Sequence, residues 1–361
     1  MSPIRIALIG CGNIAKKHLT AIYELGPAVE LVALCDMEPD RITSLLEVHA
    51  SLLSIIPKIY TDADSCIQQG NVDLIVITTS TDSHVSLALA AIHAGKHVLV
   101  EKPLALTVQD ARYIVKEAGL HKRVVAVAMQ TRYLSQIQAM KRAVDEGRFG
   151  RLMHGTVSVR WNRNMEYYKT SPWRASWVKG GGALMNQCIH YIDLLQWLMG
   201  PVVSVYGEVC TALESIEAEN IGLAILKFAN GSIGQIECST SIYPRNLLTS
   251  LSLFGERGTV SLEGEKLNIF KHWLFEETRA EDEDIVNNPE DISHTPLYQD
   301  LVYAIRTGST PLVSVETTLN SLEIVLAIYK SVAEGKQVQL PFDDFDTNQM
   351  ITKLRPGGEI E

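Results

Sequence analysis

The stretch that decides the fold is IRIALIGCGNIA, residues 4–15. Its first six residues have the apolar pattern of a strand, and GCGNIA follows directly and opens a predicted helix. In such a turn Gly10 permits the sharp change of direction, Gly12 lets the backbone approach a pyrophosphate, and the small Ala15 allows close packing of helix on strand. The N–H groups at the helix start then face the phosphates. The residues expected to bind a dinucleotide here are Gly10, Cys11, Gly12, Asn13 and Ile14.

An acidic residue stands at the end of the second predicted strand. Asp36 follows the apolar run ELVALC, residues 30–35. It comes about 20 residues after the glycine turn, a spacing typical of a carboxylate that binds the adenosine ribose hydroxyls. A carboxylate there repels a 2′-phosphate, and no Arg follows it directly, so the sequence favours NAD over NADP. A strand-terminal Asp that only caps a turn is the alternative.

The pattern of apolar runs predicts an α/β chain with two domains. Up to about residue 129, short apolar runs alternate with amphipathic stretches, as in a parallel sheet with helices on both faces. After residue 134 the runs are longer and alternate with polar residues, as in a largely antiparallel open sheet. We therefore expect three parts: a doubly wound parallel sheet of the Rossmann type over residues 1–130, an α+β domain for substrate binding and oligomerisation over 131–345, and a tail over 346–361.

Polar residues follow three further apolar runs of the predicted parallel sheet. Ligands bind at the carboxyl ends of strands in doubly wound sheets, so these residues are candidates to bind the cofactor. A structural helix cap is the alternative for the hydroxyls. The candidates are Thr79, Ser80, His84, Glu101, Lys102 and Gln130. Pro103 restrains Lys102 to extended geometry, which places this lysine reproducibly in the crevice expected for the nicotinamide.

A second polar cluster lies in GGGALMNQCIHYID, residues 180–193. Three glycines open a predicted helix, and Asn186, His190 and Asp193 fall at positions i, i+4 and i+7 on one face. Such a face is typical of a helix that lines a polar cleft, so we expect these three residues and Lys102 to be catalytic. A histidine satisfied in the core is the alternative for His190. No metal site is predicted, because no cysteine or histidine cluster stands at ligand spacing elsewhere.

Arginine and aromatic residues are dense in WNRNMEYYKTSPWRASW, residues 161–177. Such side chains stack on sugar or base rings and pair with phosphate or carboxylate groups. Loop aromatics that only fix the loop to the core are the alternative. The residues expected to bind substrate are Arg132, Arg163, Tyr167, Tyr168, Trp173, Arg174, Asn186, His190, Tyr243 and Arg245.

Composition narrows the class of protein further. The formal net charge of −10 disfavours nucleic acid as a partner, because phosphate backbones need a concentrated Lys/Arg face. No apolar run approaches the roughly 20 residues that cross a bilayer, so no membrane association is expected. The chain starts directly on a strand pattern without a leader, and its six cysteines are scattered. We expect a cytoplasmic protein with reduced thiols.

The combination of GCGNIA, EKP at residues 101–103 and the helix GGGALMNQCIHYIDLLQWLMG resembles the Gfo/Idh/MocA oxidoreductase family. The resemblance covers nearly the whole chain. It implies a Rossmann domain followed by an open-sheet domain, a nicotinamide cofactor, a sugar or cyclitol hydroxyl as the reacting group, and a homodimer or homotetramer. By motif, Lys102 corresponds to the lysine of EKP and His190 to the histidine of the catalytic helix. Many members carry an acid four residues before that histidine, whereas this chain carries Asn186.

Three segments are similar, more narrowly, to family members that oxidise the C3 hydroxyl of UDP-N-acetylglucosaminuronic acid for bacterial surface polysaccharides such as lipopolysaccharide. They are residues 161–177, the MNQ before CIHYIDLL, and YPRN at 243–246. This implies a nucleotide-sugar substrate and leaves open a 2-oxoacid co-substrate that reoxidises NADH in place.

The resemblance places Lys102 and His190 at the reacting hydroxyl. His190 is the expected base, because an unperturbed imidazole titrates close to neutral pH, while Lys102 holds the oxygen. The opposite assignment stays open. A dehydrogenase or ketoreductase of another sugar or of inositol, and a non-catalytic NAD-dependent sensor, are the alternative functions.

Overall fold

The computed structural model describes residues 2–49, 56–213, 216–288, 291–342 and 345–351. The chain divides into two compact units. The first unit comprises residues 1–105, 109–130 and 293–318, and the second comprises residues 106–108, 131–292 and 319–361. The division expected after residue 130 did not include the segment that returns to the first unit at residue 293.

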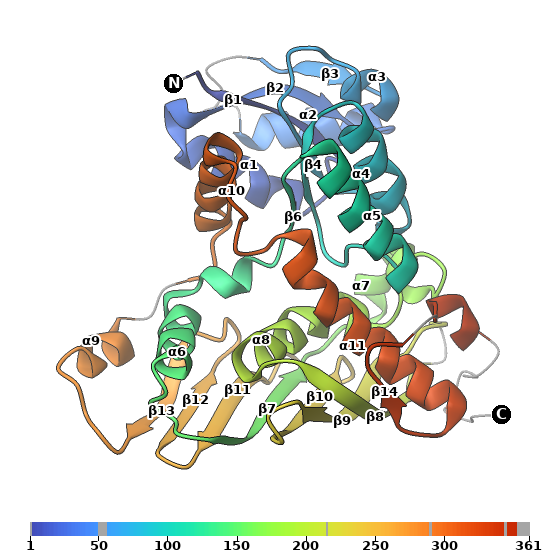
Figure 1. Ribbon diagram of the computed structural model, residues 1–361. Coiled ribbons are helices and arrows are strands. Elements are labelled where there is room, and N and C mark those ends of the chain that lie inside the picture. The colour runs from blue at the N-terminus through green and yellow to red at the C-terminus, as the bar shows by residue number, and fades with distance from the viewer. Residues whose placement is uncertain (1, 50–55, 214–215, 289–290, 343–344, 352–361) are drawn as a thin grey trace. The chain divides into compact units, whose positions relative to one another are not determined.

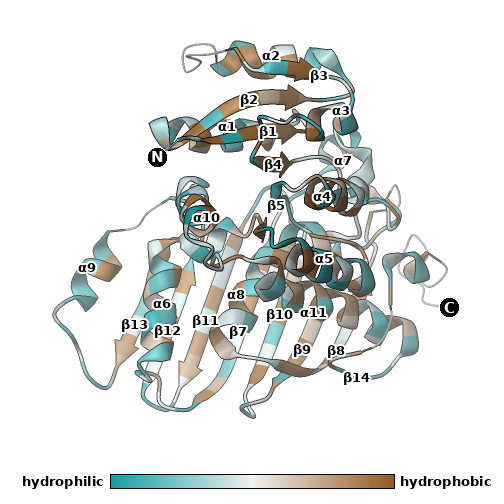
Figure 2. Cartoon of the chain, turned by 45° about the horizontal axis from the view of Figure 1, so that its top comes forward, coloured by the Kyte–Doolittle hydropathy of each residue, from teal (hydrophilic) through white to brown (hydrophobic). Residues whose placement is uncertain are grey.

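The first unit is built on a six-stranded parallel sheet with the strand order β3-β2-β1-β4-β5-β6, the order of a Rossmann doubly wound sheet. Its strands are β1 Ile4–Ile9, β2 Val29–Cys35, β3 Lys58–Tyr60, β4 Leu74–Ile77, β5 His97–Val100 and β6 Val125–Val127. Its helices are α1 Ala15–Glu24, α2 Pro39–His49, α3 Ala63–Ile67, α4 His84–His93, α5 Val108–His121 and α10 Thr295–Thr307. The central strands are almost wholly buried and mostly hydrophobic (Figure 2). The predicted parallel sheet is confirmed.

The second unit is built on an eight-stranded sheet with the order β13-β12-β11-β7-β10-β9-β8-β14. All neighbouring strands are antiparallel except β7 and β10, which are parallel. The strands are β7 Leu152–Arg160, β8 Val202–Cys210, β9 Ile221–Phe228, β10 Ile233–Ser239, β11 Leu248–Gly255, β12 Gly258–Glu263, β13 Ile269–Phe275 and β14 Val338–Gln339. The largely antiparallel sheet expected for this part of the chain is thus confirmed.

Helices lie along one face of this second sheet (Figure 1). They are α6 Ser135–Asp145, α8 Ile189–Met199 and α11 Val315–Glu334, the last from residue 319 onward. Shorter helices are α7 Met165–Lys169 and α9 Asp282–Asn287, and a π-helical turn, Leu184–Cys188, leads into α8. Single 3-10 turns lie at Gly26–Ala28, Thr81–Ser83, Gln130–Tyr133, Pro172–Ala175 and Thr347–Met350.

The expected C-terminal tail is partly folded into the second unit. Asp346 forms an isolated β-bridge with Thr107, and Met350 has no exposed surface. Residues 352–361, the remainder of the expected tail, lie outside the described residues.

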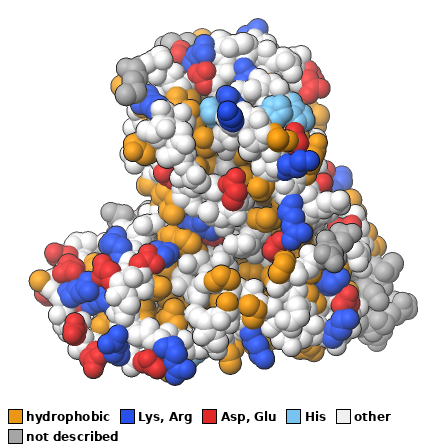
Figure 3. Space-filling model, viewed as in Figure 1, with side chains coloured by type: hydrophobic (Ala, Val, Ile, Leu, Met, Phe, Trp, Pro, Cys, Tyr) orange, Lys and Arg blue, Asp and Glu red, His pale blue; other side chains and the backbone are white. Residues whose placement is uncertain are grey.

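Two surface properties bear on possible partners. No helix of the described chain is long and apolar enough to cross a bilayer. On the face drawn in Figure 3, Lys and Arg side chains are interspersed with Asp and Glu side chains.

Candidate active site

The glycine turn between β1 and α1 has the geometry of a dinucleotide loop. Gly10 has a φ of +99°, and a methyl group on it would lie 2.7 Å from the carbonyl carbon of Thr78, at the end of β4. A methyl group on Gly12 would instead meet nothing within 4 Å. Ile14, the cap of α1, makes no side-chain capping hydrogen bond. The open side of Gly12 and the uncapped helix start therefore fit a bound pyrophosphate.

Asp36 lies against this same loop. One carboxylate oxygen accepts a hydrogen bond from the Cys11 amide at 2.7 Å, and the other accepts from the Glu38 amide at 2.9 Å. The side chain fixes the loop to the end of β2, at the point where the adenosine ribose of a dinucleotide is held in this fold. Cys11 is buried, which raises the pKa of its thiol to about 12, so this cysteine stays a neutral packing residue.

The His84 ring links the segments that follow β4 and β5. Its Nδ1 lies 2.8 Å from the carbonyl oxygen of Pro103, and its Nε2 lies 3.2 Å from that of Thr79. The ring is almost fully buried, and burial lowers its pKa. Of the nearby hydroxyls, Thr79 is half-buried and accepts a hydrogen bond from Ser83 at 2.6 Å, and Ser80 is also half-buried. His84 therefore positions the two loops that were expected to meet the cofactor.

Glu101 supports the following lysine rather than lining an open surface. It is 7% exposed, its Oε1 accepts from His18 Nε2 at 2.8 Å, and its Oε2 accepts from the Lys102 amide at 3.2 Å. Burial by itself raises the pKa of Glu101. The hydrogen bond and charge of His18 outweigh this effect and lower the pKa to about 2. Lys102 itself is half-buried at the end of β5. An ionised Glu101 thus fixes the backbone that carries Lys102.

The support of Glu101 includes residues that sequence reasoning missed. His18 Nδ1 lies 2.8 Å from the hydroxyl of Tyr298, and His294 Nε2 lies 3.9 Å from Glu101 Oε1. His18 lies one turn into α1, and this local position could have identified it as a site residue from the sequence. His294 and Tyr298 reach the cluster through the segment that returns at residue 293, and no local pattern predicts that return.

Gln130 ends the first unit at the start of a 3-10 turn. Its Oε1 is buried and has no hydrogen-bond partner among the described residues. An acceptor in this state costs free energy unless a ligand or water satisfies it. This is consistent with the predicted role of Gln130 in binding the cofactor.

The polar face expected on residues 180–193 divides into three different environments. His190 is half-buried on α8, whereas Asn186 and Asp193 are buried at 5% and 0% exposure. Asn186 lies in the π-helical turn Leu184–Cys188, so the α-helical spacing assumed for the stripe does not hold there. Its Nδ2 donates to the carbonyl oxygen of Gly180 at 2.6 Å and so fastens the glycine segment to the turn.

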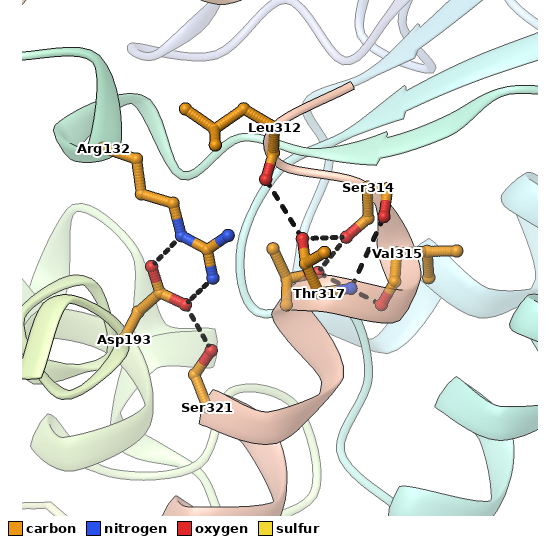
Figure 4. Close-up of polar contacts among 8 residues, drawn as sticks. Arg132, Asp193, Leu312, Ser314, Val315, Thr317 and Ser321 are labelled. Atoms are coloured by element: carbon orange, nitrogen blue, oxygen red, sulfur yellow. Dashed lines mark hydrogen bonds and ion pairs between the residues drawn. The ribbon is translucent and has the colours of Figure 1, made fainter. Parts of the chain in front are cut away.

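Asp193 and Arg132 form a fully buried ion pair. The guanidinium donates from Nε and Nη2 to the two carboxylate oxygens, each at 2.7 Å, and Ser321 donates to Asp193 Oδ1 at 2.7 Å (Figure 4). Both charged side chains have no exposed surface. Asp193, expected to be catalytic, and Arg132, expected to bind substrate, therefore act in this arrangement as residues that fix α8 to its neighbours.

A buried carboxyl group contacts the start of the π-helical turn that leads into α8. Glu219 Oε1 accepts hydrogen bonds from the Leu184 amide at 2.8 Å and from the Tyr329 hydroxyl at 2.9 Å. A methyl group on Gly182 would lie 1.1 Å from Glu219 Oε2, so only glycine fits at that position. Glu219 was not expected from the sequence, because a single acid before a strand resembles any surface residue.

The loop 161–177 brings two guanidinium groups to one aromatic ring. Arg163 lies 5.1 Å and Arg174 4.8 Å from the centre of the Tyr167 ring. Arg163 Nη1 donates to Asn246 Oδ1 at 3.0 Å, and the Tyr167 hydroxyl accepts from Gln187 at 2.8 Å. Arg163 Nε is buried and has no hydrogen-bond partner among the described residues. This combination of half-buried positive charge and aromatic surface suits an anionic, ring-containing ligand.

The other expected substrate residues differ in exposure. Tyr168 is 5% exposed, and burial raises its pKa to about 12, so it anchors the loop. Trp173 is half-buried, with Arg174 5.2 Å above its ring. Tyr243 is 91% exposed and Arg245 is also exposed, on the turn between β10 and β11.

Comparison with known proteins identifies the class. Residues 4–129 match the oxidoreductase family with an NAD-binding Rossmann fold, and residues 137–261 match the GFO/IDH/MocA C-terminal domain. The structure of the WlbA dehydrogenase of Bordetella pertussis, in complex with NADH and UDP-GlcNAcA, is 35% identical with a TM-score of 0.88, over 95% of this chain and 99% of that one. D-apiose dehydrogenase of Paraburkholderia graminis is 27% identical over 92% of this chain and 89% of its own length. Inositol 2-dehydrogenase of Salmonella typhimurium is 30% identical over 54% of each chain.

The chain therefore belongs to the Gfo/Idh/MocA oxidoreductase family. It is an NAD-dependent dehydrogenase of the sugar type, and its first unit is the NAD-binding Rossmann unit. The predicted family, cofactor and class of enzyme are confirmed.

Proposed function

We propose that this enzyme oxidises the C3 hydroxyl of a UDP-linked N-acetylhexosaminuronic acid to the 3-keto sugar, in the synthesis of nucleotide sugars for bacterial surface polysaccharides. The observation that carries the proposal is the likeness, over nearly the full length of both chains, to a WlbA dehydrogenase in complex with NADH and UDP-GlcNAcA. The relatives that act on unlinked sugars or cyclitols are less similar or match a shorter part of the chain.

The loop 161–177 supports a substrate with several negative charges. A UDP-linked uronic acid carries a diphosphate and a carboxylate, and planar guanidinium groups bind both bidentately. Arg163 and Arg174 offer such groups beside the Tyr167 ring, which gives a uracil or sugar ring a stacking surface. The exposed Tyr243 and Arg245 are further candidates for substrate contact. A small neutral sugar needs none of these charges.

Lys102 and His190 are proposed to act on the reacting hydroxyl. NAD, when bound, would supply the acceptor for the hydride that leaves the sugar carbon. His190 takes the hydroxyl proton, and Lys102 holds the oxygen and stabilises the negative charge that develops on it. Asn186 and Asp193 contribute by holding the helix that carries His190, through the contacts described above.

The first test is absorbance at 340 nm with purified enzyme, NAD and UDP-GlcNAcA, beside UDP-GlcNAc and free inositol. We expect NADH formation only with the uronate. The same reactions with 2-oxoglutarate are then analysed for keto sugar and 2-hydroxyglutarate, because retained NADH would hide turnover. Turnover of free inositol or a free pentose, with none of any UDP sugar in either arm, would contradict the proposal.

The arginines have their own test. Arg163→Ala and Arg174→Ala should each raise the KM for the UDP sugar about tenfold or more, since a hydrogen bond to a charged group contributes about 1.5–3 kcal/mol. Arg151→Ala is the matched control, because this exposed arginine pairs with Glu256 at 3.0 Å, away from the loop. An unchanged KM for the UDP sugar in both loop variants would exclude Arg163 and Arg174 from substrate binding.

Oxidation of an unlinked sugar or cyclitol is the second candidate function, favoured by the likeness to D-apiose and inositol 2-dehydrogenases. Dependence on the nucleotide separates the two, because an enzyme of the second kind turns over the free sugar as well as or better than the linked one.

A further inference from the structure

Two histidines and a glutamate converge on the surface of the first unit, outside the residues assigned to NAD or substrate. His93 is the last residue of α4, His121 is the last residue of α5, and Glu117 precedes His121 by one helical turn. The two helices lie side by side in both ribbon views (Figures 1 and 2). We propose that His93, Glu117 and His121 form a binding site for a divalent transition-metal ion, with Zn²⁺ as the best match.

The distances are close to those that such an ion requires. Glu117 Oε2 lies 2.9 Å from His93 Nε2 and 3.7 Å from His121 Nε2. All three candidate ligand atoms lie within 4.8 Å of one another. Ligand atoms at the usual distances from a tetrahedral zinc ion are about 3.4 Å apart. Small rotations of the two imidazoles therefore bring the three atoms into a shared coordination sphere.

The glutamate of the cluster is buried and its two histidines are exposed, so a metal ion can reach the cluster from solvent. The Glu117 side chain is 11% exposed, whereas those of His93 and His121 are 48% and 40% exposed. The carboxylate is thus fixed in place, and the imidazoles can adjust and open to solvent. Three protein ligands with a solvent-facing fourth position are a common arrangement for zinc.

The choice of metal follows from the donor set and the local field. Two imidazoles and one carboxylate favour Zn²⁺, Cu²⁺ or Ni²⁺ over Ca²⁺ and Mg²⁺, which prefer oxygen ligands. His93 and His121 both stand at the C-terminal ends of their helices, where the helix dipole favours a positive charge. None of the three proposed ligands is a lysine or an arginine.

The site is separate from the redox chemistry. In a βαβ unit the helix ends where the next strand begins, and α4 ends four residues before β5 starts at His97. The proposed metal therefore lies at the amino ends of the strands, whereas ligands of doubly wound sheets bind at the carboxyl ends. We infer that the ion joins α4 to α5 and stabilises the Rossmann unit without entering the reaction.

The test measures Zn²⁺ binding by isothermal titration calorimetry on the full chain, after removal of any polyhistidine tag and of metal by EDTA and dialysis. We expect one ion per chain and a rise in Tm on binding, because a ligand that binds only the folded state stabilises it. His93→Ala and His121→Ala should each weaken binding about tenfold or more and abolish the rise in Tm. His272→Ala removes an exposed histidine of β13 and should change neither quantity.

Retained NADH binding shows that each variant is folded. The other group of this kind in the described part of the chain is the buried set His18, Glu101 and His294. Undiminished Zn²⁺ binding by a His93→Ala/His121→Ala double variant would place the ion elsewhere and overturn the proposal. Absence of Zn²⁺ binding by the wild-type chain would also overturn it.

Discussion

At the scale of single residues, the two glycines of the dinucleotide loop differ in what their missing side chains permit. Gly10 has a positive φ, and a β-carbon added to it would clash with the backbone of Thr78 and Thr79. Gly12 faces open space within the chain. The first glycine is therefore required by the fold, and the second by the ligand.

Matched alanine substitutions separate these two requirements. Gly10→Ala should lower the free energy of unfolding by about 1–3 kcal/mol or more, through backbone strain and the clash at 2.7 Å. Gly12→Ala should leave the Tm of the free chain nearly unchanged but weaken NADH about tenfold or more, because its methyl group occupies the space that the pyrophosphate approaches. Thermal unfolding and NADH fluorescence titration measure the two effects. Equal Tm values for the two variants would show that this division of roles is wrong.

The two proposed catalytic residues can be distinguished by pH dependence. If His190 is the base, kcat of the wild-type enzyme rises with pH through the imidazole range, and His190→Asn loses about 100-fold in kcat together with that dependence. Lys102→Met should also lower kcat but keep the dependence. The measurement is kcat from about pH 5.5 to about pH 9, with NADH binding as the control for folding. Near-normal turnover by His190→Asn would remove His190 from the role of base.

Sequence reasoning predicted candidate site residues best where a strand fixes their place in the fold. Gly10 and Asp36 directly follow β1 and β2, and Lys102 lies two residues after the end of β5. Asn186 and Asp193 were placed with His190 on one continuous α-helix, and the π-helical turn breaks that spacing at Asn186, whereas Asp193 lies on α8 with His190. The ion pair of Arg132 with Asp193 was not predicted, because the two residues lie 61 residues apart along the chain.

At the scale of elements, the π-helical turn before α8 is held by a carboxyl group that favours its neutral form. Burial raises the pKa of Glu219 to about 8, and the hydrogen bonds from Leu184 and Tyr329 only partly oppose this. A carboxyl group whose pKa is higher in the folded chain than in the unfolded one stabilises the fold at low pH. That stabilisation is lost as the pH rises from the ordinary value of 4.5 toward 8.

Glu219→Gln tests this coupling, because the amide keeps the shape of the neutral acid and does not ionise. Between about pH 5 and about pH 8 the wild-type chain should lose up to about 4 kcal/mol of stability relative to the variant. Urea unfolding at both pH values measures the difference, with the exposed Glu265→Gln as control. A difference between variant and wild type that stays constant with pH would contradict the assignment of a raised pKa.

The elements themselves were predicted unevenly. Continuous apolar runs predicted the central strands of the parallel sheet, because a strand that is buried on both faces has apolar residues at nearly every position. The short helix α7 and the π-helical turn were not predicted, since a few residues carry too little periodicity. The return of α10 to the first unit depends on packing between segments far apart in sequence, which no local pattern encodes.

At the scale of the whole molecule, the second sheet leaves apolar side chains exposed on β8, β9 and β10. Tyr206, Leu223, Ile225 and Ile233 are 42%, 50%, 56% and 51% exposed. Tyr206 is the cross-strand neighbour of Ile225, and Leu223 and Ile225 alternate with the buried Ala224 and Leu226 of β9. These side chains therefore share one face of the sheet, on three adjacent strands in the half of the sheet that ends at β14. Apolar groups gathered in this way are typical of an interface between protein chains.

We expect this face to join copies of the chain into a dimer or tetramer. In a Leu223→Glu/Ile225→Glu variant, two carboxylates would be buried without partners at the interface, so the variant should be monomeric at concentrations where the wild type is not. Val48→Glu, which alters a residue 62% exposed on α2, should leave the assembly unchanged. Sedimentation velocity measures the mass, and NADH binding confirms that the first unit remains folded. A wild-type chain that sediments as a monomer would contradict the expectation. A double variant that keeps the wild-type mass would place the interface on another surface.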